Sequence, residues 1–303
     1  AITRLALLDQ VAPPADLCAD PRVQAHVVDL TALLRAPAAA LQDAEVVFHL
    51  AAAVSAECEA DFDLGMRSNF SATHALLEAC RALRSQPLVV FASSLAVFGQ
   101  TLLLPLPELV TDTTLPTPQS SYGIQKFIGE QLTADYGRKG FVRARNVRLM
   151  TVSVRPGRPN GAASGFLSGM VREPLAGLQA IVPVARSTAV ALSSPGRTIE
   201  GLIRAAQASD SDWGPLTALN LPALTTTVDE MANALELIAG HAGMSLVQWQ
   251  IDPQIEKIVA TWPAHVASPR AQGLGLTADT DFASIVRAYV RENAQSVKLS
   301  VKA

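Results

Sequence analysis

Residues 88–99 read Leu-Val-Val-Phe-Ala-Ser-Ser-Leu-Ala-Val-Phe-Gly, and residues 120–126 read Ser-Ser-Tyr-Gly-Ile-Gln-Lys. The first stretch is an apolar run that reaches two serines, which is typical of a buried strand ending in hydroxyl side chains. In the second stretch Tyr122 and Lys126 are four residues apart, so on a helix they share one face about one turn apart. A hydroxyl at a strand end that faces a Tyr/Lys helix predicts a catalytic arrangement.

The pairing of Tyr122 with Lys126 has a chemical reason. A free tyrosine titrates near pH ~10 and is a poor base at neutral pH, whereas a neighbouring ammonium favours the phenolate and lowers the pKa. The pair is therefore predicted to move the proton of a substrate hydroxyl, with Ser94 opposite it. The alternative is a surface lysine over a half-buried tyrosine, because this spacing also arises by chance.

Short apolar strands alternate with helical stretches through the first half of the chain. Strands are predicted at 5–8, 23–28, 46–50, 88–91 and 146–154, and helices at 31 onward, 64–83 and 122–138. This alternation predicts an α/β fold with a doubly wound parallel sheet of the Rossmann type, covered by helices on both faces. A ligand is then expected at the carboxyl ends of the strands.

The sequence changes character after Gly157, where a loop-like stretch leads into shorter elements. Helices are predicted at 166–171, 195–206, 227–239 and 281–292, and strands at 181–184, 189–192 and 216–221. We expect residues 1–157 to form a nucleotide-binding domain, to which residues of roughly 187–222 return. Residues 158–186 and 223–303 are expected to form a smaller substrate-binding lobe.

The amino-acid composition excludes some classes of function. Hydrophobic residues make up 49% of the 303 and charged residues 17%; the net charge is −3, and there is no basic block and no run of transmembrane length. Neither nucleic-acid nor membrane binding is therefore predicted. Cys18, Cys58 and Cys80 are irregularly spaced and fit reduced thiols of a cytoplasmic protein, not disulfides or a metal site. His49, in an apolar strand, is expected to be a hydrogen-bonded core residue.

Residues at the strand ends predict a dinucleotide site. Asp9 ends the first strand, where a carboxylate would accept hydrogen bonds from the adenosine ribose and repel a 2′-phosphate. No arginine follows it directly, so NAD is expected as the cofactor, with NADP as the alternative. The other expected contacts are Asp29, Leu30, Leu50, Ala51 and Ala52. The structural alternatives are a turn at Asp9, a helix cap at Asp29 and tight packing at the alanines.

No glycine-rich phosphate loop precedes Asp9, since only eight residues are available. A fold of this class without that unit would lose its pyrophosphate site and its central strand. We therefore expect the sequence as given to omit about 20–30 N-terminal residues of strand, loop and helix, a span that fits one βα unit. The alternative is a protein that lacks this unit, for which cofactor binding would not be expected.

Five motifs follow one another along the chain. They are His49-Leu50-Ala51-Ala52, Asn69 with Thr73, Ser93-Ser94-Leu95-Ala96-Val97-Phe98-Gly99, the Tyr122/Lys126 pair and Arg155-Pro156-Gly157. Together they resemble the extended short-chain dehydrogenase/reductases of the NAD-dependent epimerase/dehydratase family, from Asp9 to about Tyr289. Phe98 stands where the family usually has tyrosine, and Ser71-Ala72 stands where glycine is common. Residues 59–65, 155–160 and 169–177 are similar to the D-erythronate dehydrogenase subfamily.

The resemblance implies roles and a reaction. Tyr122 would take the proton of the substrate hydroxyl, Lys126 would lower the pKa of that tyrosine and hold the nicotinamide ribose, and Ser94 would orient the hydroxyl. Asn69 would support the site near Lys126. Pro156 and Gly157 would contact the nicotinamide carboxamide. The implied reaction is the oxidation of the 2-hydroxyl of a four-carbon sugar acid, D-erythronate, to a 2-keto acid with NAD.

A sugar-acid substrate also needs a cation, and a bidentate arginine suits a planar carboxylate best. Arg158 and Arg172 lie in the segment expected to line the substrate pocket, and either could instead be a solvated surface charge. Asn160 or Ser164 would bind the remaining hydroxyls. The resemblance also implies a homodimer, since the family pairs helices across a two-fold axis in a four-helix bundle.

Two other functions stay open on this fold. A sugar-nucleotide epimerase or dehydratase would need a larger second lobe that grips a nucleotide, and the short segment after Gly157 fits a small acid better. A non-catalytic NAD(P)-sensing regulator would have no need of a Ser/Tyr/Lys set, and all three residues are present.

Overall fold

A four-stranded parallel sheet forms the centre of the first lobe. In the computed structural model, which describes residues 2–35, 39–83, 85–157 and 163–302, its strand order is β3–β4–β5–β9. The strands span Val46–His49, Leu88–Ser94, Arg143–Leu149 and Leu219–Asn220. Strand β4 pairs with both β3 and β5, so Ser94 ends a central strand beside Leu149.

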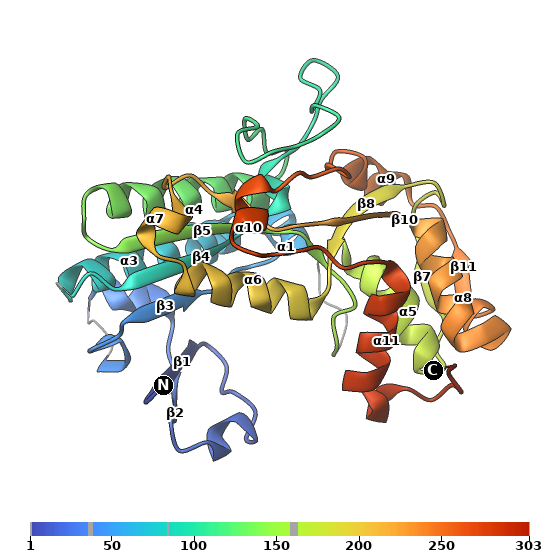
Figure 1. Ribbon diagram of the computed structural model, residues 1–303, viewed down its shortest axis with the longest axis horizontal. Coiled ribbons are helices and arrows are strands. Elements are labelled where there is room, and N and C mark those ends of the chain that lie inside the picture. The colour runs from blue at the N-terminus through green and yellow to red at the C-terminus, as the bar shows by residue number, and fades with distance from the viewer. Residues whose placement is uncertain (1, 36–38, 84, 158–162, 303) are drawn as a thin grey trace.

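Helices cover both faces of this sheet (Figure 1), which explains why β4 reads as a continuous apolar run. Helices α3 (Ala72–Ala82) and α4 (Ser121–Arg138) lie over one face, where their apolar residues surround Val89 and Ala144. Helix α6 (Pro195–Gln207) packs on the opposite face against alternate residues of the same strands, among them Leu88, Val90 and Val147. The predicted α/β class is confirmed.

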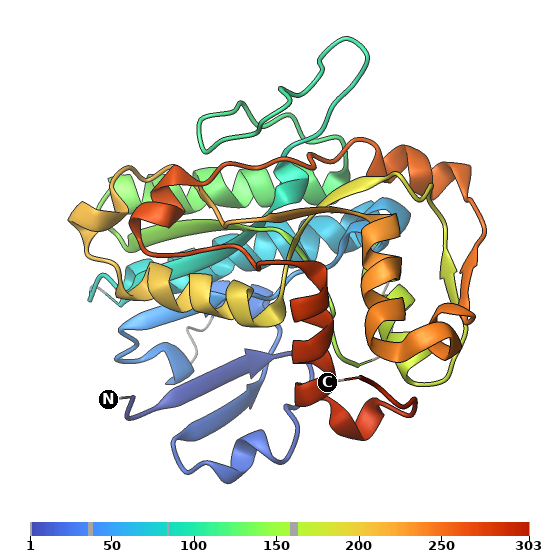
Figure 2. The same ribbon diagram turned by 45° about the vertical axis from the view of Figure 1, so that its right-hand side comes forward.

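Strands β1 (Leu5–Asp9) and β2 (Val23–Val27) form a separate parallel pair. Figures 1 and 2 both show this pair below β3, with no strand pairing between the two sheets in the described part of the chain. Apolar side chains at these strands are accessible, with Leu5, Val46 and Phe48 each 40–44% exposed. The predicted strand and glycine-rich loop ahead of Asp9 stay a prediction.

The second lobe has its own core of buried residues. Strands β6 (Thr151–Val152), β8 (Ala189–Ser193) and β10 (Leu224–Thr227) lead into it as one small sheet, and β7 (Ala180–Val182) pairs with β11 (Val247–Trp249). Helices α5 (Gly165–Leu175), α8 (Val228–Met244) and α11 (Phe282–Glu292) surround that core (Figure 1). The domain boundaries themselves stay a prediction.

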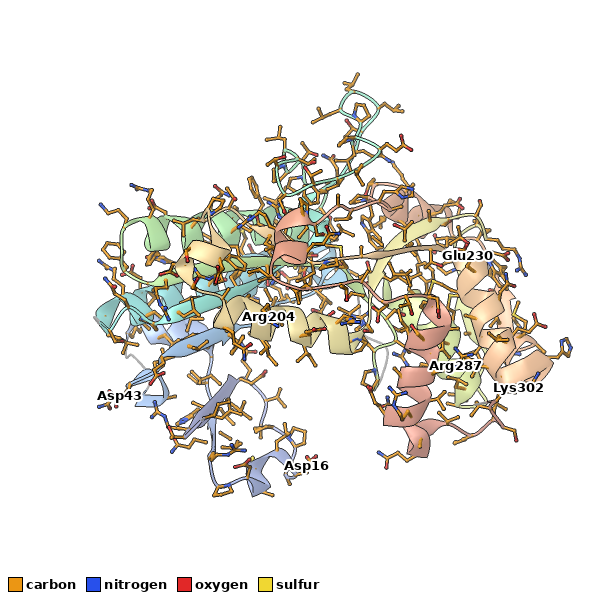
Figure 3. The ribbon with its side chains drawn as sticks, viewed as in Figure 1. Asp16, Asp43, Arg204, Glu230, Arg287 and Lys302 are labelled. Atoms are coloured by element: carbon orange, nitrogen blue, oxygen red, sulfur yellow. The ribbon has the colours of Figure 1, made fainter. Side chains whose placement is uncertain are left out.

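The remaining helices are short. They are α1 (Ser55–Ala60), α2 (Phe62–Gly65), α7 (Asp210–Trp213), α9 (Pro253–Val259) and α10 (Pro269–Gly273). The segment between β4 and α4 projects from the molecule in both ribbon views. Charged side chains are distributed over both lobes, as the labelled Asp16, Asp43, Arg204, Glu230, Arg287 and Lys302 show in Figure 3. None of the helices in the described ranges is both long and apolar enough to cross a membrane.

Two predicted helices differ from the structure. The helix expected from Thr31 is a 3₁₀ turn over Leu30–Leu34, capped by the Asp29 carboxylate at 2.9 Å from the Thr31 amide. Pro37 follows closely in the sequence, and a proline disfavours helix in the residue before it. The helix expected over 64–83 consists of α2, a π-helical turn over Met66–Ser71 and α3.

Candidate active site

Helix α4 begins where the sequence predicts, and its start brings Tyr122 to the end of β4. The Ser120 side chain accepts a hydrogen bond from the Gly123 amide at 3.1 Å, which caps the helix. A Cβ on Gly123 would lie 2.1 Å from the Ala96 carbonyl oxygen, so only glycine allows this close contact. The first turn of α4 therefore packs directly against the turn that follows Ser94.

The structure brings Ser94 and Tyr122 together. Ser94 ends β4, and its hydroxyl accepts a hydrogen bond from the Ala96 amide at 3.1 Å. Burial raises the pKa of Tyr122 to about 12, while a hydrogen bond with the Ser94 side chain acts in the opposite direction. The predicted serine–tyrosine contact is therefore present.

Lys126 lies on the same face of α4 but directs its ammonium elsewhere. Its Nζ donates to the Ala92 carbonyl at 2.8 Å and is 5.7 Å from the centroid of the Tyr122 ring. Burial lowers the pKa of Lys126 to about 8. The sequence predicts that Lys126 lowers the pKa of Tyr122, and here that pKa is raised instead. The reason is that the ammonium binds the strand backbone, and burial of the phenol dominates.

Asn69 links the end of β3 to helix α4. Its Oδ1 accepts from the Ala53 amide at 2.8 Å, and its Nδ2 donates to the Gln125 side chain, also at 2.8 Å. Asn69 is 3% exposed. Its partner Gln125 directly precedes Lys126 in the chain. The predicted support near Lys126 thus has a structural basis, and it acts through Gln125 and the backbone that follows β3.

Residues predicted to hold the adenosine half of a cofactor divide into two sets. Asp9 is exposed at the end of β1, and Leu50 and Ala51 are exposed after β3, with Ala52 half-buried. By contrast, Leu30 is buried in the core beside α3, which argues against its predicted contact with adenine. Asp29 acts as the cap of its 3₁₀ turn, the structural alternative.

Arg155 is a cation that the sequence-based assignment missed. Its amide donates to Ser168 Oγ at 3.1 Å, and its carbonyl accepts from Arg172 Nη1 at 2.8 Å, so two contacts fix its backbone. Its half-buried guanidinium has no carboxylate partner within the described ranges, and its charge lowers the pKa of Tyr122. The signal available in the sequence is its position at the start of Arg-Pro-Gly.

Arg172, one of the two predicted carboxylate ligands, is already neutralised. Its Nη2 pairs with Glu173 Oε1 at 2.7 Å, and it is 9% exposed. This pairing argues against Arg172 as the direct partner of a substrate carboxylate and indicates that it supports Arg155 instead. The other predicted substrate contacts, Arg158 and Asn160, lie outside the described residues.

A comparison of sequences with known families decides the classification. Residues 3–190 match the NAD dependent epimerase/dehydratase family. The chain belongs to this family. Ser94, Tyr122 and Lys126 all lie within the matched residues.

Two relatives within the family are similar to the chain over nearly its full length. A protein from Cupriavidus necator named D-erythronate dehydrogenase is 47% identical over 294 residues, which cover 96% of this chain and 88% of that protein. A protein of the same name from Haemophilus influenzae is 38% identical over 289 residues, which cover 95% of this chain and 90% of that protein.

Two solved structures share the fold of the chain. A structure described as the nucleoside-diphosphate-sugar epimerase from Agrobacterium tumefaciens has a TM-score of 0.86 and 36% identity, and the match covers 97% of this chain and 86% of that chain. L-threonine 3-dehydrogenase from Trypanosoma brucei has a TM-score of 0.81 at 21% identity, with coverage of 97% and 89%. The second likeness supports the fold alone.

The nicotinamide dinucleotide of the family name fits the accessible residues at both of its ends. The exposed Asp9 and Ala51 lie at the carboxyl ends of β1 and β3, where an adenosine half would be held. At the other end Pro156 and Gly157 are exposed, and among the described residues no atom lies within 4 Å of a Cβ added to Gly157. The accessible backbone at Pro156 and Gly157 is compatible with the contact to a nicotinamide that the family resemblance implies.

His49, beside this site, is a buried core residue as predicted. It is 3% exposed, its Nε2 lies 2.8 Å from Thr73 Oγ1, and burial lowers its pKa to about 3. The folded protein therefore keeps His49 neutral over a pH range in which a free histidine, with a pKa near ~6.5, takes up a proton.

Replacing His49 with leucine is expected to reduce the acid sensitivity of folding. Because the folded pKa of His49 is depressed, wild-type stability is complete above the unfolded pKa of about 6.5 and falls as the pH drops toward 3. Between pH 7 and pH 5 the wild type should lose about 2 kcal/mol more free energy of unfolding than His49→Leu. Urea unfolding at the two pH values measures this difference.

Thr73 is not orphaned in that variant, because its hydroxyl also donates to the Asn69 carbonyl at 2.6 Å. Equal losses of stability in the wild type and the variant would show that His49 titrates normally in the folded protein.

Proposed function

We propose that the chain is an NAD-dependent dehydrogenase that oxidises the 2-hydroxyl of D-erythronate, a four-carbon sugar acid, to a 2-keto acid. The observation that carries the proposal is the contact between the Ser94 hydroxyl and Tyr122 at the end of β4. The positive charge of Arg155 also acts on this phenol and lowers its pKa. The names of the Cupriavidus and Haemophilus relatives supply the substrate.

The chain's own residues move one proton in this reaction. Tyr122 accepts the proton of the C2 hydroxyl, and Ser94 orients that hydroxyl and stabilises the carbonyl oxygen as it forms. When bound, NAD supplies the hydride acceptor for the oxidation. Lys126 is four residues along the helix from Tyr122 and would hold the nicotinamide ribose, with Asn69 fixing its surroundings.

The carboxylate of the substrate is assigned to Arg155 in this proposal. A guanidinium can donate two parallel hydrogen bonds to a carboxylate, and Arg155 has its backbone fixed on both sides. Arg172 is paired with Glu173, so it orders Arg155 and adds positive charge behind it. Arg158 and Asn160 stay candidates for the remaining oxygens of the acid.

NAD is proposed over NADP because Asp9 is exposed at the end of β1. Its carboxylate accepts a hydrogen bond from the Val11 amide at 3.0 Å, which orients the carboxylate. The 2′-phosphate on the adenosine ribose of NADP would be repelled by this negative charge. Pro156 and Gly157 would contact the nicotinamide end.

Sugar-nucleotide epimerisation is the second candidate, since the Agrobacterium structure at 36% identity carries that description. The higher identity to the Cupriavidus dehydrogenase favours the first candidate. A cofactor-sensing regulator is disfavoured because such a protein has no need of a Ser/Tyr/Lys set, and Ser94, Tyr122 and Lys126 are all present.

Mixing the full-length protein with NAD and D-erythronate is expected to increase the absorbance of reduced nicotinamide. L-threonate and D-glycerate, which vary the stereochemistry and the length of the acid, should react more slowly, and NADP should replace NAD poorly. If NAD binds but no acid is oxidised, while a UDP-sugar is converted, the sugar-nucleotide function replaces this proposal.

The homodimer through a four-helix bundle and the cytoplasmic location stay predictions. Sedimentation velocity on the full-length protein would test the first, and a single species at the monomer mass would contradict it.

A further inference from the structure

Helix α4 carries a third ionisable residue on the face that presents Tyr122 and Lys126. Glu130 follows Lys126 by four residues, so the three side chains lie one above another along the helix. Gly129 permits the close approach of this face to β4, because a Cβ there would lie 2.4 Å from the Phe91 ring. Because of this approach, Glu130 is buried between α4 and the sheet and is 1% exposed.

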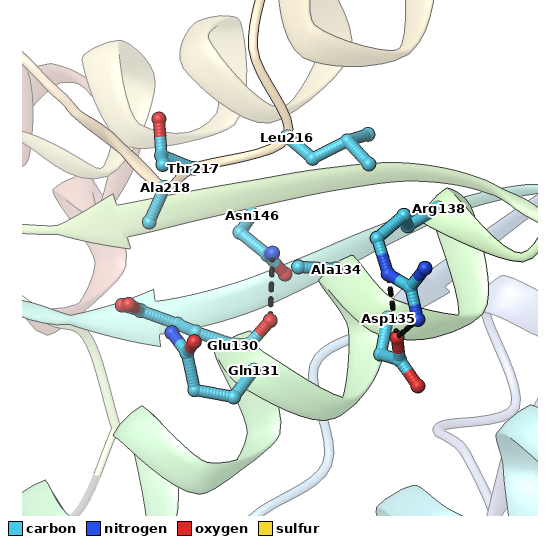
Figure 4. Close-up of a pocket in the computed structure, with 9 residues that line it drawn as sticks. All are labelled: Glu130, Gln131, Ala134, Asp135, Arg138, Asn146, Leu216, Thr217 and Ala218. Atoms are coloured by element: carbon cyan, nitrogen blue, oxygen red, sulfur yellow. Dashed lines mark hydrogen bonds and ion pairs between the residues drawn. The ribbon is translucent and has the colours of Figure 1, made fainter.

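Every described contact of the Glu130 carboxylate is with a buried donor. Oε1 accepts from Ser93 Oγ at 2.5 Å and from Arg148 Nε at 2.8 Å, and Oε2 accepts from Arg148 Nη2 at 2.7 Å. The Arg148 side chain is 5% exposed, and its guanidinium lies 4.8 Å from the centroid of the Phe98 ring. Figure 4 shows a further bond, from Asn146 Nδ2 to the Glu130 backbone carbonyl, at 3.0 Å.

Three turns of α4 therefore hold three consecutive residues at the end of β4. Lys126 binds the Ala92 carbonyl, Glu130 binds the Ser93 hydroxyl, and Tyr122 meets Ser94. Removing two charges from water costs several kcal/mol per ion, so a buried ion pair of this kind is weak evidence for stability. Its geometric effect is definite, because the Ser93 bond and the bidentate bond to β5 fix how far α4 can slide along the sheet.

We propose that Glu130, clamped by Arg148, is a positioning residue that sets the register of α4 against the end of β4 and places a paired carboxylate one helical turn from Lys126. The kinetic part of this inference rests on the proposed dehydrogenase function. The structural and titration parts concern the chain alone and do not depend on any substrate.

The charge effect follows from the groups that face Lys126. Burial lowers its pKa to about 8, and Cys58 and then the Glu130 carboxylate act in the opposite direction. The other ionisable groups facing it are the Cys58 thiol from α1, His49 from β3 and Tyr122 from its own helix. His49 is neutral, so Glu130 is the carboxylate that supports the ammonium.

The test compares Glu130→Gln with Asp135→Asn, an exposed acid on the same helix that pairs with Arg138. In protein labelled with ¹⁵N-lysine, the Nζ titration of Lys126 should shift to lower pH in Glu130→Gln and stay unchanged in Asp135→Asn. The alkaline limb of the kcat profile with D-erythronate should move in the same direction, with kcat reduced about tenfold or more and KM changed far less.

The double variant Glu130→Gln/Arg148→Met covers the case in which Glu130→Gln fails to fold, because it leaves no unpaired buried arginine. It should regain wild-type melting behaviour yet keep the lowered Lys126 titration and the reduced kcat. A wild-type Lys126 titration in a folded Glu130 variant would overturn the proposal. Absence of dehydrogenase activity in the wild type would instead refute the proposed function and leave the titration result to stand.

Discussion

Replacing Tyr122 with phenylalanine is expected to lower kcat for D-erythronate oxidation by about a hundred- to ten-thousandfold, the usual contribution of a positioned proton acceptor. The change removes only the phenolic oxygen, which is the atom that meets the Ser94 hydroxyl. Lys126 keeps its bond to the Ala92 carbonyl, so the affinity for NAD should stay within about threefold of the wild type. Steady-state kinetics and a titration of NAD binding measure the two effects.

Tyr136→Phe is the matched control, because Tyr136 lies on the same helix and its hydroxyl hydrogen-bonds to Glu78 instead of the active site. Near wild-type kcat is expected for this control. If Tyr122→Phe oxidises D-erythronate at a near wild-type rate with intact NAD binding, Tyr122 does not have the proposed role.

The pKa of Tyr122 places a condition on that role. With a pKa of about 12 the phenol is protonated at neutral pH, and a proton acceptor needs a much lower value. Arg155 already acts to lower it, and Lys126 could do so only if its ammonium moved from the Ala92 carbonyl toward the phenol. The resting arrangement therefore favours Arg155 as the cation that lowers the pKa of the tyrosine, in addition to its proposed contact with the acid.

The local parts of the site were predictable from the sequence. The cap at Ser120, the helix through Tyr122 and Lys126 and the strand that ends at Ser94 depend on residues within a few positions of one another. The confirmed burial of His49 likewise follows from its place within an apolar strand. Short-range patterns of this kind carry the element type, and with it the α/β class.

The parts that could not be predicted depend on contacts between distant segments. The partner of Lys126 is a carbonyl 34 residues away, and the partner of Glu130 lies on the next strand, 18 residues away. Both follow from how closely α4 approaches β4, which Gly129 permits. The strand-end position of Leu30 predicts a contact with a ligand, but packing against α3 buries its side chain.

Arg155→Met is expected to raise the KM for D-erythronate about thirtyfold or more, because a charge-assisted bidentate pair contributes roughly 2–3 kcal/mol. The KM for NAD should change little. Loss of the positive charge should also raise the pKa of Tyr122 further, so the acidic limb of the kcat/KM profile should move to higher pH. Kinetics across the pH range with both substrates varied measure all three quantities.

A substrate without the carboxylate charge is the control. It separates loss of carboxylate binding from a general loss of activity in the variant. The wild type should use D-erythronate far better than its neutral amide, and Arg155→Met should lose most of that preference, since the cation that distinguishes the two is gone. If Arg155→Met keeps the preference and Arg172→Met loses it, the carboxylate is held by Arg172 after release from Glu173, and the assignment to Arg155 is wrong. The pairing of Arg172 with Glu173 and the bond it donates to the Arg155 carbonyl favour the first result, because an arginine already neutralised gains less from a second carboxylate.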